Sequence, residues 1–257
     1  MIINGRSISP GKAKGVAIVY PEPFSFLGGV DGSTGRFNVM DGDITDKVFV
    51  FPNGKGSTVG SYVVYDLKVH GHAPLALVNR SAETIVTTGS VISDVPMVDG
   101  VDISLIRDGD TLEVDGDTGA LEIVGIKDTD VIMSFIVRDG KFLMVHREPH
   151  SHAYPSKWTL VTSYVAKGVD LDSAVIDSVK EKTGIAVDAP AGTMDAIQFR
   201  GKHTIYTVHA YMFKVSSDEV TLDADNTEYK WVSPEEFDSE ETIDAVAKVV
   251  SNFTKLI

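Results

Sequence analysis

Residues 47–67 read KVFVFPNGKGSTVGSYVVYDL, and this stretch decides the fold of the first half of the chain. The apolar, β-branched run 47–52 predicts a buried strand. The run 58–70 spaces its apolar residues as a helix does and stops before Gly71, which suits a C-terminal cap. Residues 54–58 therefore predict a glycine-rich loop that leaves a strand and enters a helix.

This loop, Gly54-Lys55-Gly56-Ser57-Thr58, has the properties of an anion site. A loop that enters a helix presents backbone N–H groups without intrahelical partners, together with the positive end of the helix dipole. An alkoxide is stabilised in such a place, so Ser57 is a candidate general base. The position also suits an ordinary helix N-cap, and the residues alone leave both interpretations open. The loop is not a Walker A motif, because Lys55 precedes the second glycine.

Short strands punctuated by glycine surround this stretch up to residue 126. Further strands are predicted at 15–20, 75–79 and 84–93, and the runs DTLEVDG and ALEIVG predict a hairpin around the turn at 116–119. The pattern changes at 127–130. We therefore place a domain boundary there, with one domain at 1–126 and a second at 127–257, and expect the two to fold independently.

The second half alternates strands and helices. The run 132–147 predicts a hairpin around Asp139-Gly140, and 205–215 alternates as a strand does. The strongest helix pattern covers 171–182, opening on Asp172 and closed by Gly184. Residues 233–253 predict a C-terminal helix or pair of helices. The fold class is therefore α+β.

Composition limits the possible functions. The 257 residues carry 23 Lys+Arg against 37 Asp+Glu, a formal charge of −14, which disfavours nucleic acid but allows a small anionic substrate at a local cationic loop. No apolar run is long enough for a membrane span, and the N-terminus lacks a signal-peptide core, so we expect a cytoplasmic protein. With no cysteine, this chain cannot hold an iron–sulfur cluster through thiolates of its own.

Four segments of the first domain occur together in a characteristic order: SFLGGVDGSTG (25–35), FPNGKGSTVGSYVVYDL (51–67), GHAPLALVN (71–79) and IVTTGSVISDVPMVD (85–99). Together they resemble the small-subunit or swivel domain of the aconitase X family. The resemblance implies a β-rich, swivelling β/β/α domain. It also implies dehydration of a hydroxy acid, with phosphomevalonate of the archaeal mevalonate route as the implied substrate.

The same resemblance assigns roles to individual residues. It implies that Ser57 removes the proton next to the substrate carboxylate. Substrate-binding roles fall on Lys55, Gly56 and Thr58, and on a facing loop of Gly28, Gly29 and Asp31. The iron–sulfur cluster would be supplied by a cysteine-bearing, aconitase-like large subunit, which agrees with the absence of cysteine here.

The second half resembles the Nudix family, an α/β/α sandwich, through its hairpin, PSKWTLV, EKTGI and EYKWVSPEEF. Active members carry GX5EX7REUXEEXGU, in which glutamates one turn apart hold Mg²⁺ against a diphosphate. Counting back from Gly184 places Ser163 at the first glycine and Val169 at the first glutamate. The two metal-holding positions carry Ser178 and Lys182, so we expect a non-hydrolytic domain.

Alternatives remain open for this domain. Asp177 and Glu181 form a displaced i,i+4 carboxylate pair, which fits either an alternative metal site or an exposed charged helix face. The chain could instead act as a Nudix hydrolase or as a nucleotide- or diphosphate-binding module. Two further groups carry no prediction: His146, His150 and His152 straddle a proline loop, and Asp223, Asp225 and Glu228 lack the glycine of a calcium loop.

Overall fold

The computed structural model describes residues 1–151 and 154–256. They form two compact units, Met1–Lys127 and Asp128–Ile257. Both units are mixed α/β structures built on a single sheet, which confirms the predicted fold class. None of the described helices is long and apolar enough to cross a membrane.

The first unit is described throughout, and its eight strands form one mixed sheet with the order β1-β8-β7-β3-β4-β5-β6-β2. Strands β3, β4, β5 and β6 run parallel, while β7 and β8 form the predicted hairpin. The elements are β1 (Ile2–Asn4), β2 (Arg6–Ser9), β3 (Lys12–Val19), α1 (Phe26–Gly29), β4 (Lys47–Phe51), α2 (Gly60–Val69), β5 (Ala76–Asn79), α3 (Thr84–Ile92), β6 (Met97–Asp99), the 3-10 turn η1 (Ile103–Leu105), β7 (Thr111–Asp115) and β8 (Ala120–Ile123).

A cluster of aromatic rings fills the core beside α1 and β4. The ring centroid of Phe24 lies 4.8 Å from that of Phe49 and 5.1 Å from that of Phe26, and all three side chains are buried. Phe49 and Phe51 stack on each other within β4. This packing fixes the loop around α1 against the strand that leads into residues 54–58.

The predicted strand at 84–93 is wrong, because these residues form the helix α3. Its buried residues Val86, Gly89 and Ser90 follow helical rather than alternating spacing. The carboxylate of Glu83 accepts hydrogen bonds from the N–H groups of Ile85 and Val86 and so caps the helix. Tertiary packing and this cap outweigh the β-branched composition of the run.

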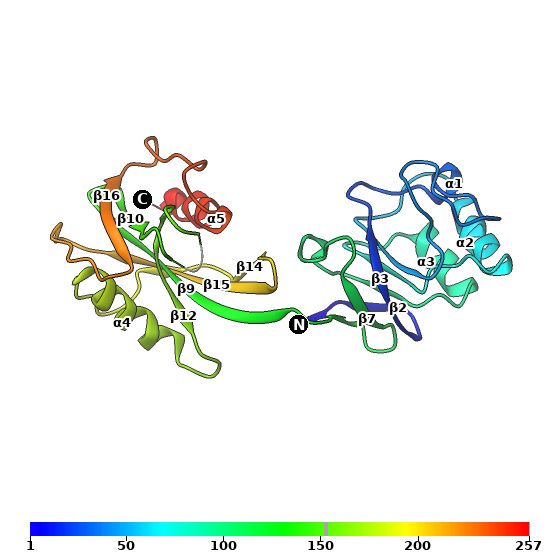
Figure 1. Ribbon diagram of the computed structural model, residues 1–257, viewed down its shortest axis with the longest axis horizontal. Helices are drawn as coiled ribbons and strands as arrows, with labels where there is room; N and C mark the ends of the chain where they lie inside the picture. Colours follow the sequence, from blue (N-terminus) through cyan, green and yellow to red (C-terminus); the bar gives the residue numbers. More distant parts are fainter. Residues whose placement is uncertain (152–153, 257) are drawn as a thin grey trace. The chain divides into compact units, whose positions relative to one another are not determined.

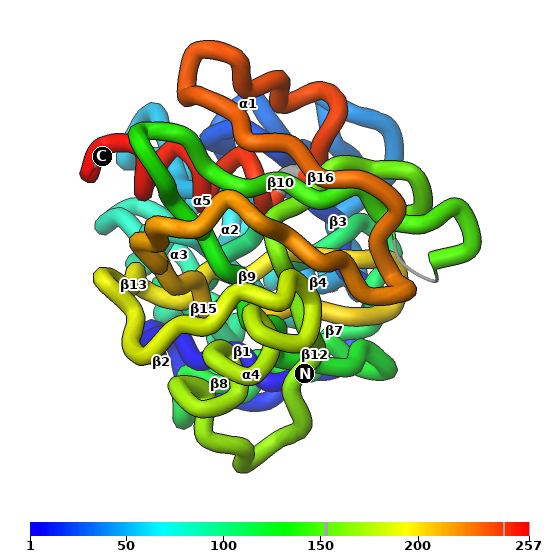
Figure 2. Tube along the Cα trace, turned by 90° about the vertical axis from the view of Figure 1, so that its left-hand side faces the viewer, coloured from blue at the N-terminus to red at the C-terminus, as the bar shows by residue number. Residues whose placement is uncertain are grey.

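In the second unit, α4 and α5 cover opposite faces of the sheet, as Figure 1 shows, so this unit is an α/β/α sandwich. Strand β10 pairs with β16 along its length, and the two run side by side in Figure 2. The elements are β9 (Lys127–Arg138), β10 (Lys141–Arg147), β11 (Trp158–Thr159), β12 (Val161–Val165), α4 (Leu171–Thr183), β13 (Gly192–Thr193), β14 (Ile197–Arg200), β15 (Thr204–Lys214), β16 (Asn226–Val232), α5 (Asp244–Phe253) and the 3-10 turn η2 (Thr254–Leu256).

Helix boundaries differ from the predicted ones in three places. Helix α2 begins at Gly60 rather than at residue 58. Asp170, not Asp172, caps α4 by accepting from the N–H of Ser173, while Gly184 ends it as predicted. The C-terminal helix starts only at Asp244, because residues 233–243 form turns.

Candidate functional site

The loop 54–58 lies at the carboxyl end of β4, where β4 has parallel neighbours on both sides. Loops at the carboxyl ends of parallel strands are the usual place for a ligand in open α/β sheets. A turn at Thr58 and Val59 joins this loop to α2. The predicted strand–loop–helix unit is therefore present.

Ser57 is exposed, and its hydroxyl lies at the entry to α2. Its Oγ accepts a hydrogen bond from the N–H of Val59 at 3.3 Å, and its carbonyl oxygen accepts from the N–H of Gly60 at 2.8 Å. The bond to Oγ closes a short turn before α2 and is not a helix cap, because Val59 is the N-cap residue and no side chain caps the helix. A donated N–H favours the deprotonated hydroxyl, because hydrogen bonds to a charged form stabilise it.

The two loop glycines are required by close neighbours. Gly56 has a φ of +99°, which favours glycine, and a Cβ there would lie 2.7 Å from Oγ of Ser25. A Cβ on Gly54 would lie 2.2 Å from a carboxylate oxygen of Glu83. Substitution of either glycine would therefore displace the neighbouring side chains or the loop itself.

Phe24 and Ser25, which precede the predicted facing loop of Gly28 and Gly29, lie against the loop 54–58. The N–H of Lys55 donates to the carbonyl of Phe24 at 2.9 Å, which joins the two segments through the backbone. Gly28 is exposed with a φ of +85°, while Gly29 is buried against the ring of Phe24.

The other predicted binding residues differ in what they offer. Lys55 and Thr58 are exposed beside Ser57. Asp31 accepts hydrogen bonds from the hydroxyl and the N–H of Ser33, and these bonds lower the pKa of its carboxyl group. Asp31 thus stabilises its own turn.

Two acidic residues that the sequence analysis missed, Asp99 and Glu83, hold the backbone segment next to the loop 54–58. Asp99 is buried, and both of its oxygens accept from the guanidinium of Arg6, at 2.9 and 2.7 Å. One of them also accepts from the N–H of Ala82 at 2.9 Å, which fixes the segment that carries Glu83. Glu83 in turn caps α3 and touches Gly54. A predicted helix starting at residue 84 would have identified Glu83 as its cap. A strand was predicted at 84–93 instead, so Glu83 was missed.

In the second unit, the structure brings two of the substituted box positions together. The hydroxyl oxygens of Ser163 on β12 and Ser178 on α4 lie 2.7 Å apart, and Ser178 is buried. A pair of neutral hydroxyls satisfies each other and offers no negative charge to a divalent cation. Val169, at the first glutamate position, is exposed and apolar.

Lys182 forms an internal ion pair at the other metal-holding position. Its Nζ lies 2.8 Å from a carboxylate oxygen of Asp223 and 2.8 Å from one of Asp225, and its side chain is 13% exposed. Burial works to lower the pKa of Lys182, but the hydrogen bonds to both aspartates outweigh it and hold the pKa above its ordinary value. The hydrogen bond and charge of Lys182 lower the pKa of Asp225. An ammonium group thus occupies the position where the box would carry a glutamate.

The alternative metal residues Asp177 and Glu181 are exposed on α4. In the described part of the chain, no three His, Cys, Asp or Glu side chains gather in a way that could hold a metal ion. His146 contacts the hydroxyl of Thr227, and its ring lies 5.0 Å from Trp158. His152 lies outside the described residues.

Comparison with known proteins agrees with this division into two units. The model of the aconitase X swivel domain matches residues 2–123. The phosphomevalonate dehydratase small subunit of Thermococcus kodakarensis is 52% identical over 129 residues, which cover 48% of this chain and 97% of that protein. The protein of the same name from Methanocaldococcus jannaschii is 47% identical over 131 residues, covering 48% and 98%. The chain belongs to the aconitase X swivel-domain family.

The model of the NUDIX domain matches residues 128–253, so this chain joins an aconitase X swivel domain to a Nudix domain. Among solved structures, Thermococcus kodakaraensis aconitase X in its holo-form is 50% identical, covering 48% of this chain and 98% of that chain with a TM-score of 0.47. A MutT protein from Methanosarcina mazei is 24% identical, covering 52% and 97% with a TM-score of 0.47.

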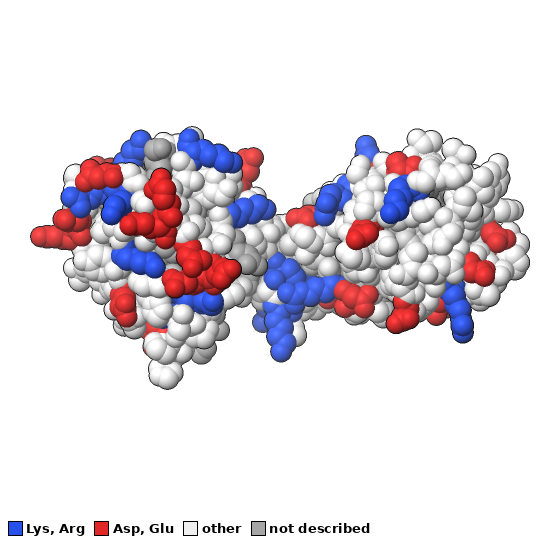
Figure 3. Space-filling model, turned by 90° about the horizontal axis from the view of Figure 1, so that it is seen from above, with Lys and Arg blue, Asp and Glu red and all other residues white. Residues whose placement is uncertain are grey.

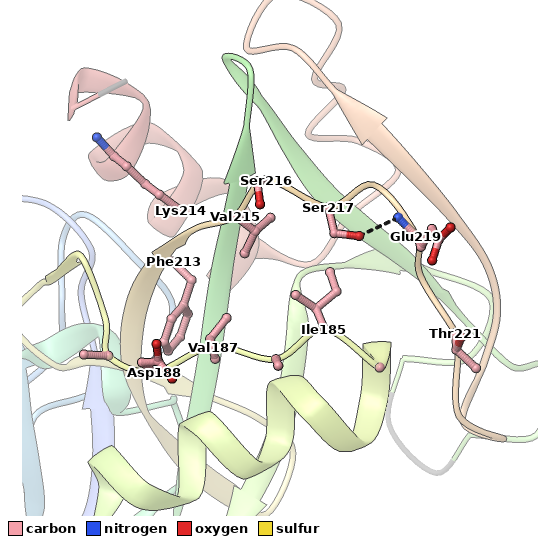
Figure 4. Close-up of a pocket in the computed structure, with 13 residues that line it drawn as sticks. Ile185, Val187, Asp188, Phe213, Lys214, Val215, Ser216, Ser217, Glu219 and Thr221 are labelled. Carbon is pink, nitrogen blue, oxygen red and sulfur yellow. Dashed lines mark hydrogen bonds between the residues drawn. The ribbon is translucent and has the colours of Figure 1, made fainter.

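Two surface hollows lie away from the predicted site residues. One, of ≈ 530 Å³, lies in the Nudix domain between the segment after α4 and the end of β15. Figure 4 shows Ile185, Val187 and Phe213 along it, Asp188 and Glu219 near its ends, and Lys214 directed away. The other, of ≈ 560 Å³, lies over β3, β7 and β8 of the swivel domain, where Lys12 pairs with Asp115 and Lys14 with Glu113.

Proposed function

We propose that this chain is the small subunit of a cytoplasmic hydro-lyase that dehydrates phosphomevalonate to anhydromevalonate phosphate. The family membership supports the reaction, and the observation that carries it to a residue is the exposed Ser57 hydroxyl at the entry to α2. In its alkoxide form, Oγ takes the proton from the carbon next to the substrate carboxylate and becomes a hydroxyl. The C–H electron pair becomes the new double bond, and the hydroxyl on the neighbouring carbon leaves with its bonding pair and takes up a proton to form water.

The residues around Ser57 bind and orient the substrate in this proposal. Lys55 supplies a positive charge for a carboxylate or phosphate, and the backbone at Gly56 and Thr58 approaches the anion without a bulky side chain in the way. Gly28 and Gly29 close the other side. Asp31 remains a candidate only through its position on the facing loop, since its carboxylate is engaged by Ser33.

The cofactor belongs to the partner in this proposal. This chain has no cysteine and, within its described residues, no cluster of potential metal ligands, so it does not fit an iron–sulfur cluster. A cysteine-bearing large subunit would carry the cluster, whose chemistry is Lewis-acid activation of the leaving hydroxyl. The test is to combine the purified chain with the large subunit of the same organism and follow phosphomevalonate. Dehydration should require both chains, and a complex that acts only on another hydroxy acid would discard this substrate.

We propose further that the Nudix domain does not hydrolyse diphosphates. The serine pair and the Lys182 ion pair replace both metal-holding positions, and neither can form a dicarboxylate site. Purified chain with Mg²⁺ and a panel of nucleoside diphosphate derivatives should show no turnover approaching ~1 s⁻¹. Activity at that rate, lost in Glu181→Gln, would instead establish a hydrolase with a relocated metal.

Binding without hydrolysis is the second candidate for this domain. Tyr164 is exposed, and its ring centroid lies 6.3 Å from that of Tyr206. Exposed aromatic rings favour stacking with a flat nucleobase. Calorimetry with ADP in the absence of Mg²⁺ tests this. Wild type should release heat on binding ADP, and Tyr164→Ala should not bind it.

A further inference from the structure

The loop 54–58 has a neighbouring segment on each side, because β4 runs parallel to β3 on one side and to β5 on the other. The segment that follows β3 leads to the predicted facing loop of Gly28 and Gly29. The segment that follows β5, residues 80–83, has no role in the proposed function. In open α/β sheets, ligands bind across the loops at neighbouring carboxyl strand ends. Residues 80–83 are therefore placed to contact the same substrate.

Arg80 is held directly against the strand end that carries this loop. Its N–H and the N–H of Ser81 both donate to the carbonyl oxygen of Pro52, each at 3.0 Å. The preceding residue, Asn79, is buried, and its Nδ2 donates to the carbonyl oxygen of Phe51 at 2.9 Å. These hydrogen bonds fix the backbone of Arg80 beside Pro52, close to the start of the loop.

The guanidinium of Arg80 is available to a ligand. Its side chain is exposed and forms no ion pair or hydrogen bond with another residue of the described part of the chain. Two acidic groups of the same region have other partners, since Asp99 binds the guanidinium of Arg6 and Glu83 caps α3. Arg80 thus keeps an unpaired positive charge beside a loop that is proposed to bind an anion.

Other cations are sparse in the part of the swivel domain around α1 and α2. On the face that Figure 3 shows, the end where Figure 1 places these two helices carries only scattered charged groups. Within the loop 54–58 itself, Lys55 is the one cationic residue. A ligand with two anionic groups would therefore depend on individual side chains, of which Arg80 is one.

The proposed substrate carries a carboxylate and a phosphate at opposite ends of its carbon chain. In the proposed reaction Ser57 removes the proton next to the carboxylate, so that group lies near Ser57 and Lys55. The phosphate then extends away from this point and needs a cation of its own. A guanidinium suits it, because its planar fork forms two parallel hydrogen bonds to phosphate oxygens, whereas an ammonium acts as a point charge.

We propose that Arg80 binds this phosphate and thereby selects phosphorylated hydroxy acids over unphosphorylated ones. The inference rests on the proposed function and goes beyond it by assigning the phosphate-binding side chain. Lys55 then holds the carboxylate, and the exposed hydroxyl of Ser81 adds a donor on the same segment as Arg80. The start of α3 does not compete for the phosphate, because Glu83 already accepts from the N–H groups there.

The test compares the steady-state kinetics of wild type, Arg80→Met and Arg80→Lys, each combined with the large subunit of the same organism. Arg80→Met should raise KM for phosphomevalonate roughly 30-fold or more and leave kcat within about threefold, because a contact that is equally strong in the ground and transition states affects KM alone. Arg80→Lys should restore part of the affinity, with KM roughly tenfold above wild type. Inorganic phosphate should inhibit wild type competitively, and Arg80→Met should need roughly tenfold more of it for the same inhibition.

Lys14→Met is the matched control. Lys14 is exposed on β3 and pairs with Glu113, so its loss removes the same charge from the same domain without touching residues 80–83. Its KM should stay within about twofold of wild type, since exposed ion pairs contribute little. Both substituted side chains are exposed, so the variants should fold, as a thermal melt of each will show.

The outcomes separate this inference from the proposed function. If wild type dehydrates phosphomevalonate and Arg80→Met does so with the same KM, Arg80 does not bind the phosphate, while the proposed function stands. If Arg80→Met instead loses kcat and remains as sensitive to inorganic phosphate as wild type, the role of Arg80 is structural and the inference is overturned. A wild-type complex that leaves phosphomevalonate unchanged would overturn the proposed function, and this inference with it.

Discussion

The entry to α2 and the helix α4 differ in whether charged side chains of the protein neutralise them. At α2, the exposed hydroxyl of Ser57 accepts from the N–H of Val59, and the first turn of the helix carries no acidic side chain. At α4, the position that would hold a metal carries Lys182, and two aspartates neutralise it within the domain. In our proposal, the first arrangement serves a ligand. The second pairs its charges within the domain and contributes to stability.

The largest expected effect tests the chemical side of this comparison. Ser57→Ala removes the only side-chain oxygen proposed to take the proton, so the reconstituted complex should lose at least ~100-fold in dehydration rate. If the hydroxyl only closed the turn before α2, its loss would cost ~1 kcal/mol of stability and leave turnover intact. The measurement is steady-state turnover of phosphomevalonate, with a thermal melt of each variant.

Ser104→Ala provides the control for Ser57→Ala. Ser104 is also an exposed serine in a turn of the swivel domain, where its hydroxyl donates to Asp102. Its removal should change the melting temperature slightly and leave turnover within twofold. Near-normal turnover in Ser57→Ala would mean that Ser57 has only a structural role. Neither of the two regions would then provide a catalytic group.

The next effect tests the structural side. Lys182→Met removes the ammonium and leaves Asp223 and Asp225 facing each other, with Asp223 only 17% exposed. Losing one member of a buried ion pair costs several kcal/mol, and we expect on the order of 2–3 kcal/mol here because Asp225 is largely exposed. Urea unfolding of the full chain, followed by the fluorescence of Trp158 and Trp231, measures this in the Nudix domain.

Lys180→Met is the matched control, since Lys180 lies on the exposed side of the same helix. It should change the free energy of unfolding by less than ~0.5 kcal/mol. Equal effects of the two substitutions would mean that Lys182 is an ordinary surface lysine. The inference that Lys182 forms a stabilising ion pair at the metal-holding position would then be wrong.

What the sequence could predict follows the range of the interactions. The strand, loop and helix around Ser57 are local, so their composition and spacing were sufficient. Helix α3 was missed because its run is β-branched and its cap is Glu83, a residue less common at that position than serine or aspartate. The partners of Lys182 could not be predicted, because Asp223 and Asp225 lie about forty residues along the chain and only tertiary packing brings them together.

The smallest expected effect concerns Asp99. Its ion pair with Arg6 resembles the pair at Lys182, but it lies in the swivel domain and holds the segment beside the candidate site. Burial works to raise the pKa of Asp99, but the guanidinium of Arg6 and the N–H of Ala82 outweigh it and hold the pKa below its ordinary value. The unfolded chain, with an aspartate pKa of ~3.9, therefore binds the proton more readily than the folded chain does. The stabilisation is present above about pH 4 and is lost as the pH falls through the lower, folded value.

Asp99→Asn should therefore lower the free energy of unfolding of the swivel domain by roughly 1–2 kcal/mol at pH 7, because a charged hydrogen-bond acceptor is lost while Arg6 remains mostly in water. The difference between wild type and variant should shrink as the pH falls from 6 to 2, measured by urea unfolding at each pH. Asp41→Asn, which changes an exposed carboxylate, should give a difference near zero throughout. A difference for Asp99→Asn that is constant with pH would show that the hydrogen bonds matter and the charge does not. The contribution of Asp99 to stability beside the Ser57 loop would then depend on hydrogen-bond geometry and not on charge, unlike that of the ion pair at Lys182.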